Sequence, residues 1–395
     1  MRRALFAALL AATLLCTASG GGGREIEGCL FVIAMAVDPA EDGNLTVTVK
    51  ALSGTQEAAA PQESGQADAT EDAAPAGRME TAEPGYVTLS ATADSCLAAL
   101  NLLSATTPRS VDLSQLREIV LAETLARTDA TLTILRQISA LYEANGGAVV
   151  VVTPDDAGDF IRRQYAMFGV RLSQYLEVLF DHFAQLGTIP ATAQLATVLG
   201  AMESSTADAA AVYAAGNAFD APLVLNGASQ TDRLPGHLPR TSPAKNEYLG
   251  SAVFSGARMV GTLTGDETAI LRMISGQALN ISITMGEALY QISVHSRTRR
   301  TLDWENGAPV LGVRVVIRMA LSAGTQQDTA AELGRQLEAD AAQLLLRLQA
   351  MGSDPVGFGH LAVRRYADIP AWEASGWADA YRSAAVRVAA NVHIQ

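Results

Sequence analysis

The sequence is poor in the residues on which most binding and redox sites depend. Its 395 residues include two lysines, Lys50 and Lys245, and three cysteines, and the formal net charge is −13. Nucleic-acid affinity rests mainly on Lys and Arg contacts to phosphate, so this composition is not that of a nucleic-acid-binding protein. An acidic chain also gains nothing from anionic lipid headgroups. Membrane association would therefore have to come from a lipid anchor or a protein partner.

Histidine and cysteine are too scarce and too scattered for the common metal and disulfide arrangements. The five histidines are dispersed, and no His-Glu-x-x-His motif is present. We therefore predict no metal site and no cofactor. Cys16, Cys29 and Cys96 form no Cys-x-x-Cys pair and are too few for a disulfide framework. Cys29 and Cys96 are predicted to be small buried residues, and a disulfide between them stays an open alternative.

The sequence also lacks a set of catalytic motifs typical of an enzyme. The segment Ser242-Pro243-Ala244-Lys245 matches the Ser-x-x-Lys pattern of penicillin-recognising hydrolases. It lies in a Pro-rich stretch, however, and the partner motifs of those enzymes are missing. We therefore predict that the protein is not an enzyme and has no catalytic residues.

No apolar run is long enough for a transmembrane helix. Met1-Arg2-Arg3 followed by the apolar run from Ala4 to Leu15 is typical of a signal peptide, which we assign to residues 1–19. The run has about 12 residues, whereas a helix needs about 20 to span a bilayer. Four glycines follow at 20–23. The mature protein is therefore predicted to be exported.

Hydrophobic patterning predicts an α+β fold that is multidomain, with mixed sheets flanked by helices. We predict an N-terminal domain at 20–190, a connector or small domain at 191–244, and a strand-rich C-terminal domain with a long helix at 245–395. Residues 53–85 are rich in Ala, Glu, Gln, Gly and Pro and are predicted to be a disordered acidic insert. The long helix, about Asp328–Met351, carries one apolar stripe and should end at Gly352.

Shorter elements follow from local signals. Cys29–Val37 and Asn44–Lys50 are predicted to form a hairpin. Thr153 and Asp266 are expected to cap helices that extend to about 168 and 274. Further strands are predicted at 86–92, 116–122, 148–152, 222–225, 249–254, 259–263, 279–285, 288–297, 310–321 and 386–394. Further helices are predicted at 94–104, within 123–144, at 173–186 and at 191–202.

Two motifs near the ends of the chain carry a family resemblance. The first is Arg24-Glu25-Ile26-Glu27 with the apolar strand from Phe31 to Asp38, and the second is Met351-Gly352-Ser353-Asp354-Pro355-Val356-Gly357-Phe358-Gly359. Segments 116–126 and 249–263 support them in order and spacing. On these residues the sequence resembles the Ger(x)C family, the C subunit of bacterial spore germinant receptors, over nearly the whole mature chain. The motif residues are Arg24, Glu25, Ile26, Glu27, Asp38, Gly352, Ser353, Asp354, Gly357, Phe358 and Gly359.

The resemblance implies a non-catalytic exported subunit that acts in nutrient-triggered spore germination. Its implied partners are the A subunit and the transporter-like B subunit of the receptor, both in the inner spore membrane. It implies a place on the outer face of that membrane. The alternative is an exported solute-binding protein or lipoprotein, which would show two similar α/β lobes; the sequence shows no internal repeat.

The lipid anchor that the resemblance implies is not settled by the sequence. In the family the lipidated cysteine lies shortly before the motif arginine, at the position that Gly20 occupies here. Three interpretations stay open: Cys16 is lipidated, ordinary cleavage follows Ala18 or Gly20, or the anchor has been lost. Thr13-Leu14-Leu15, which precede Cys16, fit a lipoprotein signal poorly.

Overall fold

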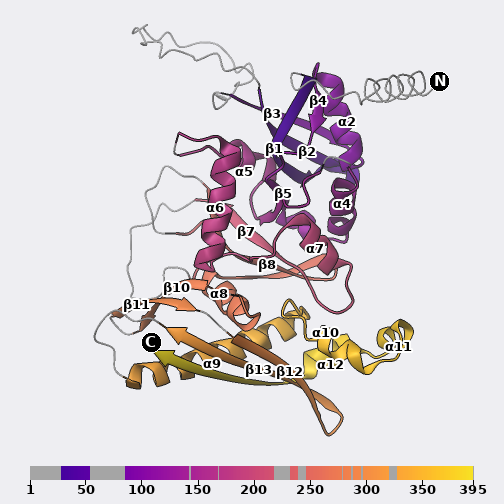
Figure 1. Ribbon diagram of the computed structural model, residues 1–395. Helices are drawn as coiled ribbons and strands as arrows, with labels where there is room; N and C mark the ends of the chain where they lie inside the picture. Colours follow the sequence, from indigo (N-terminus) through magenta and orange to yellow (C-terminus); the bar gives the residue numbers. More distant parts are fainter. Residues whose placement is uncertain are drawn as a thin grey trace, which may run out of the picture.

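A nine-stranded sheet forms the larger part of the molecule (Figure 1). The computed structural model describes residues 28–53, 85–141, 144–167, 169–217, 232–238, 246–277, 279–285, 288–294, 297–319 and 327–394. The strand order is β3-β2-β1-β5-β6-β7-β8-β9, and β4 pairs with β1. The strands are β1 (Cys29–Pro39), β2 (Leu45–Leu52), β3 (Tyr86–Ala93), β4 (Ser110–Asp112), β5 (Glu118–Ala122), β6 (Val149–Thr153), β7 (Ala210–Gly216), β8 (Asn246–Ser255) and β9 (Arg258–Leu263).

The centre of this sheet is parallel and its two edges are antiparallel. Strands β1, β5, β6 and β7 run in the same direction. The predicted hairpin of β1 and β2 extends one edge together with β3, and β8 and β9 extend the other. Helices cover both faces, so the central strands are almost continuously apolar, as a buried parallel sheet requires.

Helices pack on the two faces of the nine-stranded sheet and enclose its hydrophobic core. Figure 1 shows α2 and α4 on one side of the sheet and α5 and α6 on the other. Helix α7 packs against α4. The helices are α2 (Cys96–Thr106), α3 (Glu123–Ala126), α4 (Ala130–Ser139), α5 (Ala157–Arg162), α6 (Leu172–Leu186) and α7 (Leu195–Met202). Cys29 and Cys96 are buried, as predicted, and no disulfide joins them.

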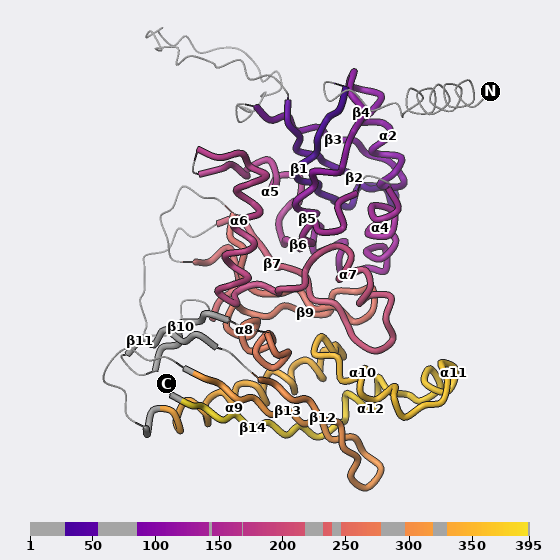
Figure 2. The backbone as a smooth tube through the Cα atoms, in the orientation of Figure 1, coloured from indigo at the N-terminus to yellow at the C-terminus, as the bar shows by residue number. Residues whose placement is uncertain are grey.

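The C-terminal part contains a second sheet, in the order β12-β13-β14, and the long helix that packs on it. Figure 2 shows this part lying along one end of the main sheet. A separate hairpin, β10–β11, lies near β13. The elements are α8 (Gly265–Ile274), β10 (Leu279–Met285), β11 (Ala288–Val294), β12 (Arg297–Glu305), β13 (Ala308–Met319), α9 (Gln327–Met351), α10 (Gly359–Ala362), α11 (Ile369–Glu373), α12 (Trp377–Ser383) and β14 (Ala385–Ile394).

Helix α9 has the buried stripe that its sequence predicts. Its buried residues recur every three or four positions, which places them on one face of an α-helix. They are Leu333, Leu337, Ala341, Leu344 and Leu348, and Leu345 beside them is buried as well. Gly352 ends the helix in the left-handed region at φ 69°, and the N–H of Ser353 donates to the carbonyl of Leu348 at 3.0 Å.

Strand β8 joins the two hydrophobic cores. Phe254 belongs to the core of the main sheet, and its neighbour Val253 belongs to the core around α9. Adjacent residues of a strand point to opposite faces, so one strand supplies both cores. The predicted boundary at 245 stays a prediction; β7, β8 and β9 extend the sheet that begins with β1.

The structure confirms the α+β class with mixed sheets flanked by helices, but it corrects two helix caps. Asp156, not Thr153, caps α5, and its carboxylate accepts the N–H of Asp159 at 2.7 Å. Thr264, not Asp266, caps α8 through a capping box with Glu267. The capping side chain lies three residues after the predicted one at α5 and two residues before it at α8, and the local chain path decides which side chain reaches the amides.

Some strands and helices also differ from the predictions. Strand β7 has no counterpart among the predicted strands, because its alanine-rich sequence has no apolar alternation. The predicted strand 288–297 is split between β11 and β12, and the predicted helix 191–202 begins at Leu195. The signal peptide (1–19), the strand predicted at 222–225 and residues 54–84 of the acidic insert lie outside the described residues. Among the helices that the structure describes, none is long and apolar enough to cross a membrane.

Candidate functional site

The second motif forms a tight turn directly after α9. The carboxylate of Asp354 accepts the N–H of Gly357 and the N–H of Gly359, both at 2.9 Å. Phe358 is fully buried in the core around α9. The sequence predicts that Asp354 and Ser353 satisfy local amides. This prediction is confirmed for Asp354, but the Ser353 hydroxyl instead donates to the carbonyl of Phe254 on β8, at 2.5 Å.

Hydrogen bonds of a second aspartate, Asp208, connect this turn to the main sheet. It lies in the loop between α7 and β7, and its carboxylate accepts the N–H of Asp354 and the N–H of Gly256, each at 2.8 Å. In return the N–H of Asp208 donates to the carbonyl of Asp354 at 3.1 Å. Three segments therefore contact one another here: the turn after α9, the α7–β7 loop and the β8–β9 turn. We call this contact region the joint.

Close backbone packing completes the joint. Gly359 lies so near the α7–β7 loop that a Cβ atom there would be 2.4 Å from the carbonyl oxygen of Thr206. The Ser255 hydroxyl donates to the carbonyl of Gly352 at 2.8 Å, and the Tyr381 hydroxyl donates to the carbonyl of Ser353 at 2.8 Å. The polar groups of the motif are thus largely engaged in holding two parts of the chain together.

Burial changes the acidity of the two aspartates. It raises the pKa of Asp354 from 3.8 to about 7, although the backbone N–H groups at its carboxylate act in the opposite direction. Burial also raises the pKa of Asp208, again against two backbone hydrogen bonds. The negative charge of Asp208 adds to the rise at Asp354. The joint thus contains a carboxyl group that titrates near neutral pH.

A cavity of about 300 Å³ lies beside the joint, between the main sheet and the C-terminal part. Its walls come from α7, the α7–β7 loop, α8, the start of β12 and the turn after α9. The side chains that matter chemically are Asp208, Arg272, Gln277, Arg300 and His360. The ring nitrogen Nδ1 of His360 lies 2.7 Å from the hydroxyl of Thr206.

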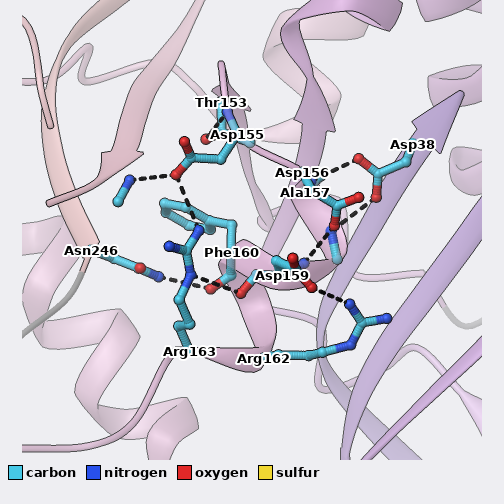
Figure 3. A network of polar contacts seen from close by, with 12 residues as sticks. Asp38, Thr153, Asp155, Asp156, Ala157, Asp159, Phe160, Arg162, Arg163 and Asn246 are labelled. Atoms are coloured by element: carbon cyan, nitrogen blue, oxygen red, sulfur yellow. Dashed lines mark hydrogen bonds and ion pairs between the residues drawn. The ribbon is translucent and has the colours of Figure 1, made fainter. Parts of the chain in front are cut away.

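Asp38, the last residue of the first motif, holds α5 against β1 (Figure 3). Its carboxylate accepts the N–H of Ala157 at 2.7 Å and the N–H of Gly158 at 2.9 Å. Burial raises its pKa, and these two hydrogen bonds partly offset the rise. Nearby, the carboxylate of Asp155 accepts the N–H of Gly216 at 2.6 Å, which links the end of β6 to the end of β7. Asp38 therefore has a structural role at the carboxyl ends of the parallel strands.

The main sheet also buries a polar network that the sequence analysis missed. Glu118 is fully buried and accepts hydrogen bonds from Gln164 and from the hydroxyl of Tyr248, the latter at 3.2 Å. The Lys50 ammonium donates to the carbonyl of Gln164. Burial raises the pKa of Glu118 to about 7. These groups are enclosed by the core.

The remaining predicted site residues precede residue 28, where the described part of the chain begins. Cys16 and Arg24, Glu25, Ile26 and Glu27 lie outside the described residues, as does the Ser242–Lys245 segment. In the part of the chain that the structure describes, no group of three or more His, Cys, Asp or Glu side chains could hold a metal ion.

Sequence reasoning also missed Asp208 and Arg272. Asp208 is a single acidic residue among alanines, and its partner Asp354 is 146 residues away. Arg272 did carry a signal, because it interrupts the apolar run Leu271 to Ile274 of a helix. A charged residue at such a position is buried or lies at the edge of a core.

The comparisons with known proteins match the chain on both sides of the joint. The spore germination protein N-terminal domain matches residues 22–215, and the spore germination B3/GerAC-like C-terminal domain matches residues 249–395. Among solved structures, the crystal structure of the GerBC protein shares 16% sequence identity; the match covers 94% of this chain and 99% of that chain, with a TM-score of 0.48. No curated protein matches the sequence. Since the two family domains span most of its length in order, the chain belongs to the Ger(x)C family of spore germination proteins.

Proposed function

We propose that this chain is the C subunit of a germinant receptor, a non-catalytic exported subunit that acts in nutrient-triggered spore germination. The observation that carries the proposal is the pair of family domains, which match residues 22–215 and 249–395. Its partners would be the A and B membrane subunits of the receptor. The chain would bind and signal within that complex.

The geometry of the second motif supports a structural and signalling role. Ser353 and Asp354 are both buried, and their side chains form hydrogen bonds to backbone groups. A nucleophile or general base has to face a substrate, whereas these groups face the protein's own backbone. The motif therefore connects the two parts of the chain, and a movement at one part can be transmitted to the other.

The proposed location is the outer face of the inner spore membrane. It is supported by the leader-like start of the sequence, Met1-Arg2-Arg3 with the apolar run that follows. Attachment would come from the receptor partners, from lipid on Cys16, or from both. The acidic composition makes direct binding to anionic headgroups unfavourable.

The test is a pull-down of the tagged protein from spore membranes, together with mass spectrometry of its mature N-terminus. We expect two polytopic membrane proteins to co-purify, and the mass to show whether Cys16 carries lipid. A soluble protein that brings down no membrane partner would overturn the proposal and favour an exported solute-binding protein.

The same pull-down with substituted proteins tests the role of the first motif. We expect the double change Arg24→Ala and Glu25→Ala to weaken co-purification, because this segment precedes β1 and would lie near the membrane. A matched control removes an exposed pair of the same charges, Arg335 and Glu332 on α9, which form an ion pair there. If both double variants retained the partners equally, the first motif would have no role in assembly.

A further inference from the structure

The cavity beside the joint is built from both parts of the molecule. One wall comes from α7 and the α7–β7 loop, and the other comes from α8, β12 and the turn after α9. Its volume of about 300 Å³ corresponds to roughly ten water molecules in the liquid. That size is at the lower end of the range for small-molecule sites.

Arg272 is a buried cation with no acidic partner in the part of the chain that the structure describes. Its side chain is only 6% exposed, yet no carboxylate of the described chain forms an ion pair with it. Loss of water around the guanidinium lowers its pKa to about 10, and no negative charge of the described chain opposes the shift. Buried charges are normally paired, so this guanidinium lacks the anion that its surroundings call for.

Hydrogen bonds to the protein use only some of the donors of the Arg272 guanidinium. Nη1 donates to the carbonyl of Ala184 and, at 3.3 Å, to that of Ile189, which places it at the end of α6. Nε donates to the side chain of Gln277 at 2.8 Å. These contacts use neutral acceptors and leave Nη2 without a hydrogen-bond partner among the described residues.

A second cation, Arg300, lines the same cavity. Arg300, on β12, donates through Nη1 to the carbonyl of Val356 in the turn after α9. In the described chain it forms no ion pair with a carboxylate. The acidic group in the lining is Asp208, and both of its oxygens already accept backbone N–H groups of the joint. The cavity therefore presents a buried guanidinium, that of Arg272, and an exposed one, that of Arg300, and neither is paired with a carboxylate of the described chain.

We propose that this cavity binds a small molecule that carries a carboxylate or phosphate group, with Arg272 and Arg300 as its charge partners. Guanidinium groups suit both anions, because their planar N–H donors match the spacing of two anionic oxygens. A ligand held by both arginines would bridge α8 and β12 and would lie against the turn after α9. It would thereby stabilise the joint. The inference does not depend on the receptor assignment.

The test measures thermal unfolding and calorimetric binding of the purified full chain. Sodium acetate and inorganic phosphate are the anionic probes, acetamide is the neutral probe, and sodium chloride at matched ionic strength is the reference. We expect a saturable rise in Tm with acetate, with phosphate or with both, and none with acetamide. A response to acetate alone identifies a carboxylate ligand, and a response to phosphate alone identifies a phosphate ligand.

Three variants make the result specific to the cavity. Arg300→Gln should weaken binding by about tenfold or more, as loss of a charge-assisted contact predicts. Arg272→Gln should do the same, and Arg300→Gln decides the question if the Arg272 variant does not fold. Arg299→Gln is the matched control, since it removes an exposed positive charge from the opposite face of the same strand. No anion-specific rise, or equal binding in the Arg299 and Arg300 variants, overturns the proposal.

Discussion

Because Gly359 has no side chain, its backbone can pack closely against the α7–β7 loop. A Cβ atom at this position would lie 2.4 Å from the carbonyl oxygen of Thr206, and the backbone of the α7–β7 loop would have to move. We therefore expect Gly359→Ala to lower the free energy of unfolding by about 1–3 kcal/mol, the usual cost of an overpacked contact. Chemical denaturation measures the change.

The control for this substitution is Gly200→Ala in α7. A Cβ atom there meets nothing within 4 Å, and alanine favours a helix over glycine by about 1 kcal/mol. We expect this variant to be as stable as the wild type or more stable. Equal destabilisation of the two variants would contradict the argument from close packing.

Asp354 should make the stability of the protein depend on pH. Its pKa is 3.8 when unperturbed and about 7 in the folded protein, so the folded state keeps a proton that the unfolded chain releases. The free energy of unfolding should therefore fall as the pH rises from about 4 to about 7, by at most about 1.4 kcal/mol per pH unit from this group.

Asp354→Asn isolates the contribution of this carboxyl group. The buried Glu118 titrates in the same range in both proteins, so it contributes equally to both curves. We expect the stability difference between wild type and variant to change between pH 4 and pH 7 and to be constant above pH 7. Parallel curves over the whole range would show that Asp354 does not titrate there.

At the scale of single elements, helix α8 begins with a capping box. The Thr264 hydroxyl accepts the N–H of Glu267 at 3.2 Å, and the Glu267 carboxylate accepts the N–H of Thr264 at 2.9 Å. Thr264→Ala should cost about 1 kcal/mol of unfolding free energy, because it leaves a helix amide without an acceptor. Thr264→Ser keeps the hydroxyl and should be close to the wild type in urea denaturation. If Thr264→Ala and Thr264→Ser lowered the free energy of unfolding equally, the loss would come from the methyl group and not from the hydroxyl.

Helix α9 is the element in which local sequence and final structure agree best. Its stripe predicts a helix from about Asp328 to Met351, and the structure has α9 at Gln327–Met351. The agreement has a physical cause, since the stripe, the length and the terminal Gly352 all favour the same helix. At α5 the signals were ambiguous: Thr153 and Asp156 are both good capping residues, and only the path of the chain selects Asp156.

The whole molecule should unfold as one unit, because β8 supplies both hydrophobic cores. The three tryptophans lie in the C-terminal part, so their fluorescence reports on that part alone, whereas far-UV circular dichroism reports on the whole chain. We expect the two signals to have the same midpoint. Phe358→Ala should lower the free energy of unfolding by about 3–5 kcal/mol and shift both midpoints together.

Two separate transitions would contradict this expectation. They would show that the contacts of Asp208, Ser353 and Asp354 do not couple the cores. The conservative change Phe358→Leu serves as the control, since it keeps most of the buried volume and should give a smaller common shift.

Elements with local signals can be predicted from the amino-acid sequence alone. These are the β1–β2 hairpin, the buried strand β6, the apolar face of α9 and the two end motifs that indicate the family. Period-two and three-to-four-residue patterns record which face of an element is buried, so they can be recognised without knowing the partner. The same local logic predicted that Asp354 binds amides of its own turn.

How those elements assemble depends on contacts between distant segments, which the folded structure shows. It brought Asp208 to Asp354 across 146 residues, added the alanine-rich β7 to the sheet, and placed Arg272 and Arg300 in the lining of one cavity. None of these facts has a local signature, because burial and pairing depend on segments far apart in the chain. The joint and its cavity therefore come from packing between the two parts of the molecule, for which the sequence supplies only the separate surfaces.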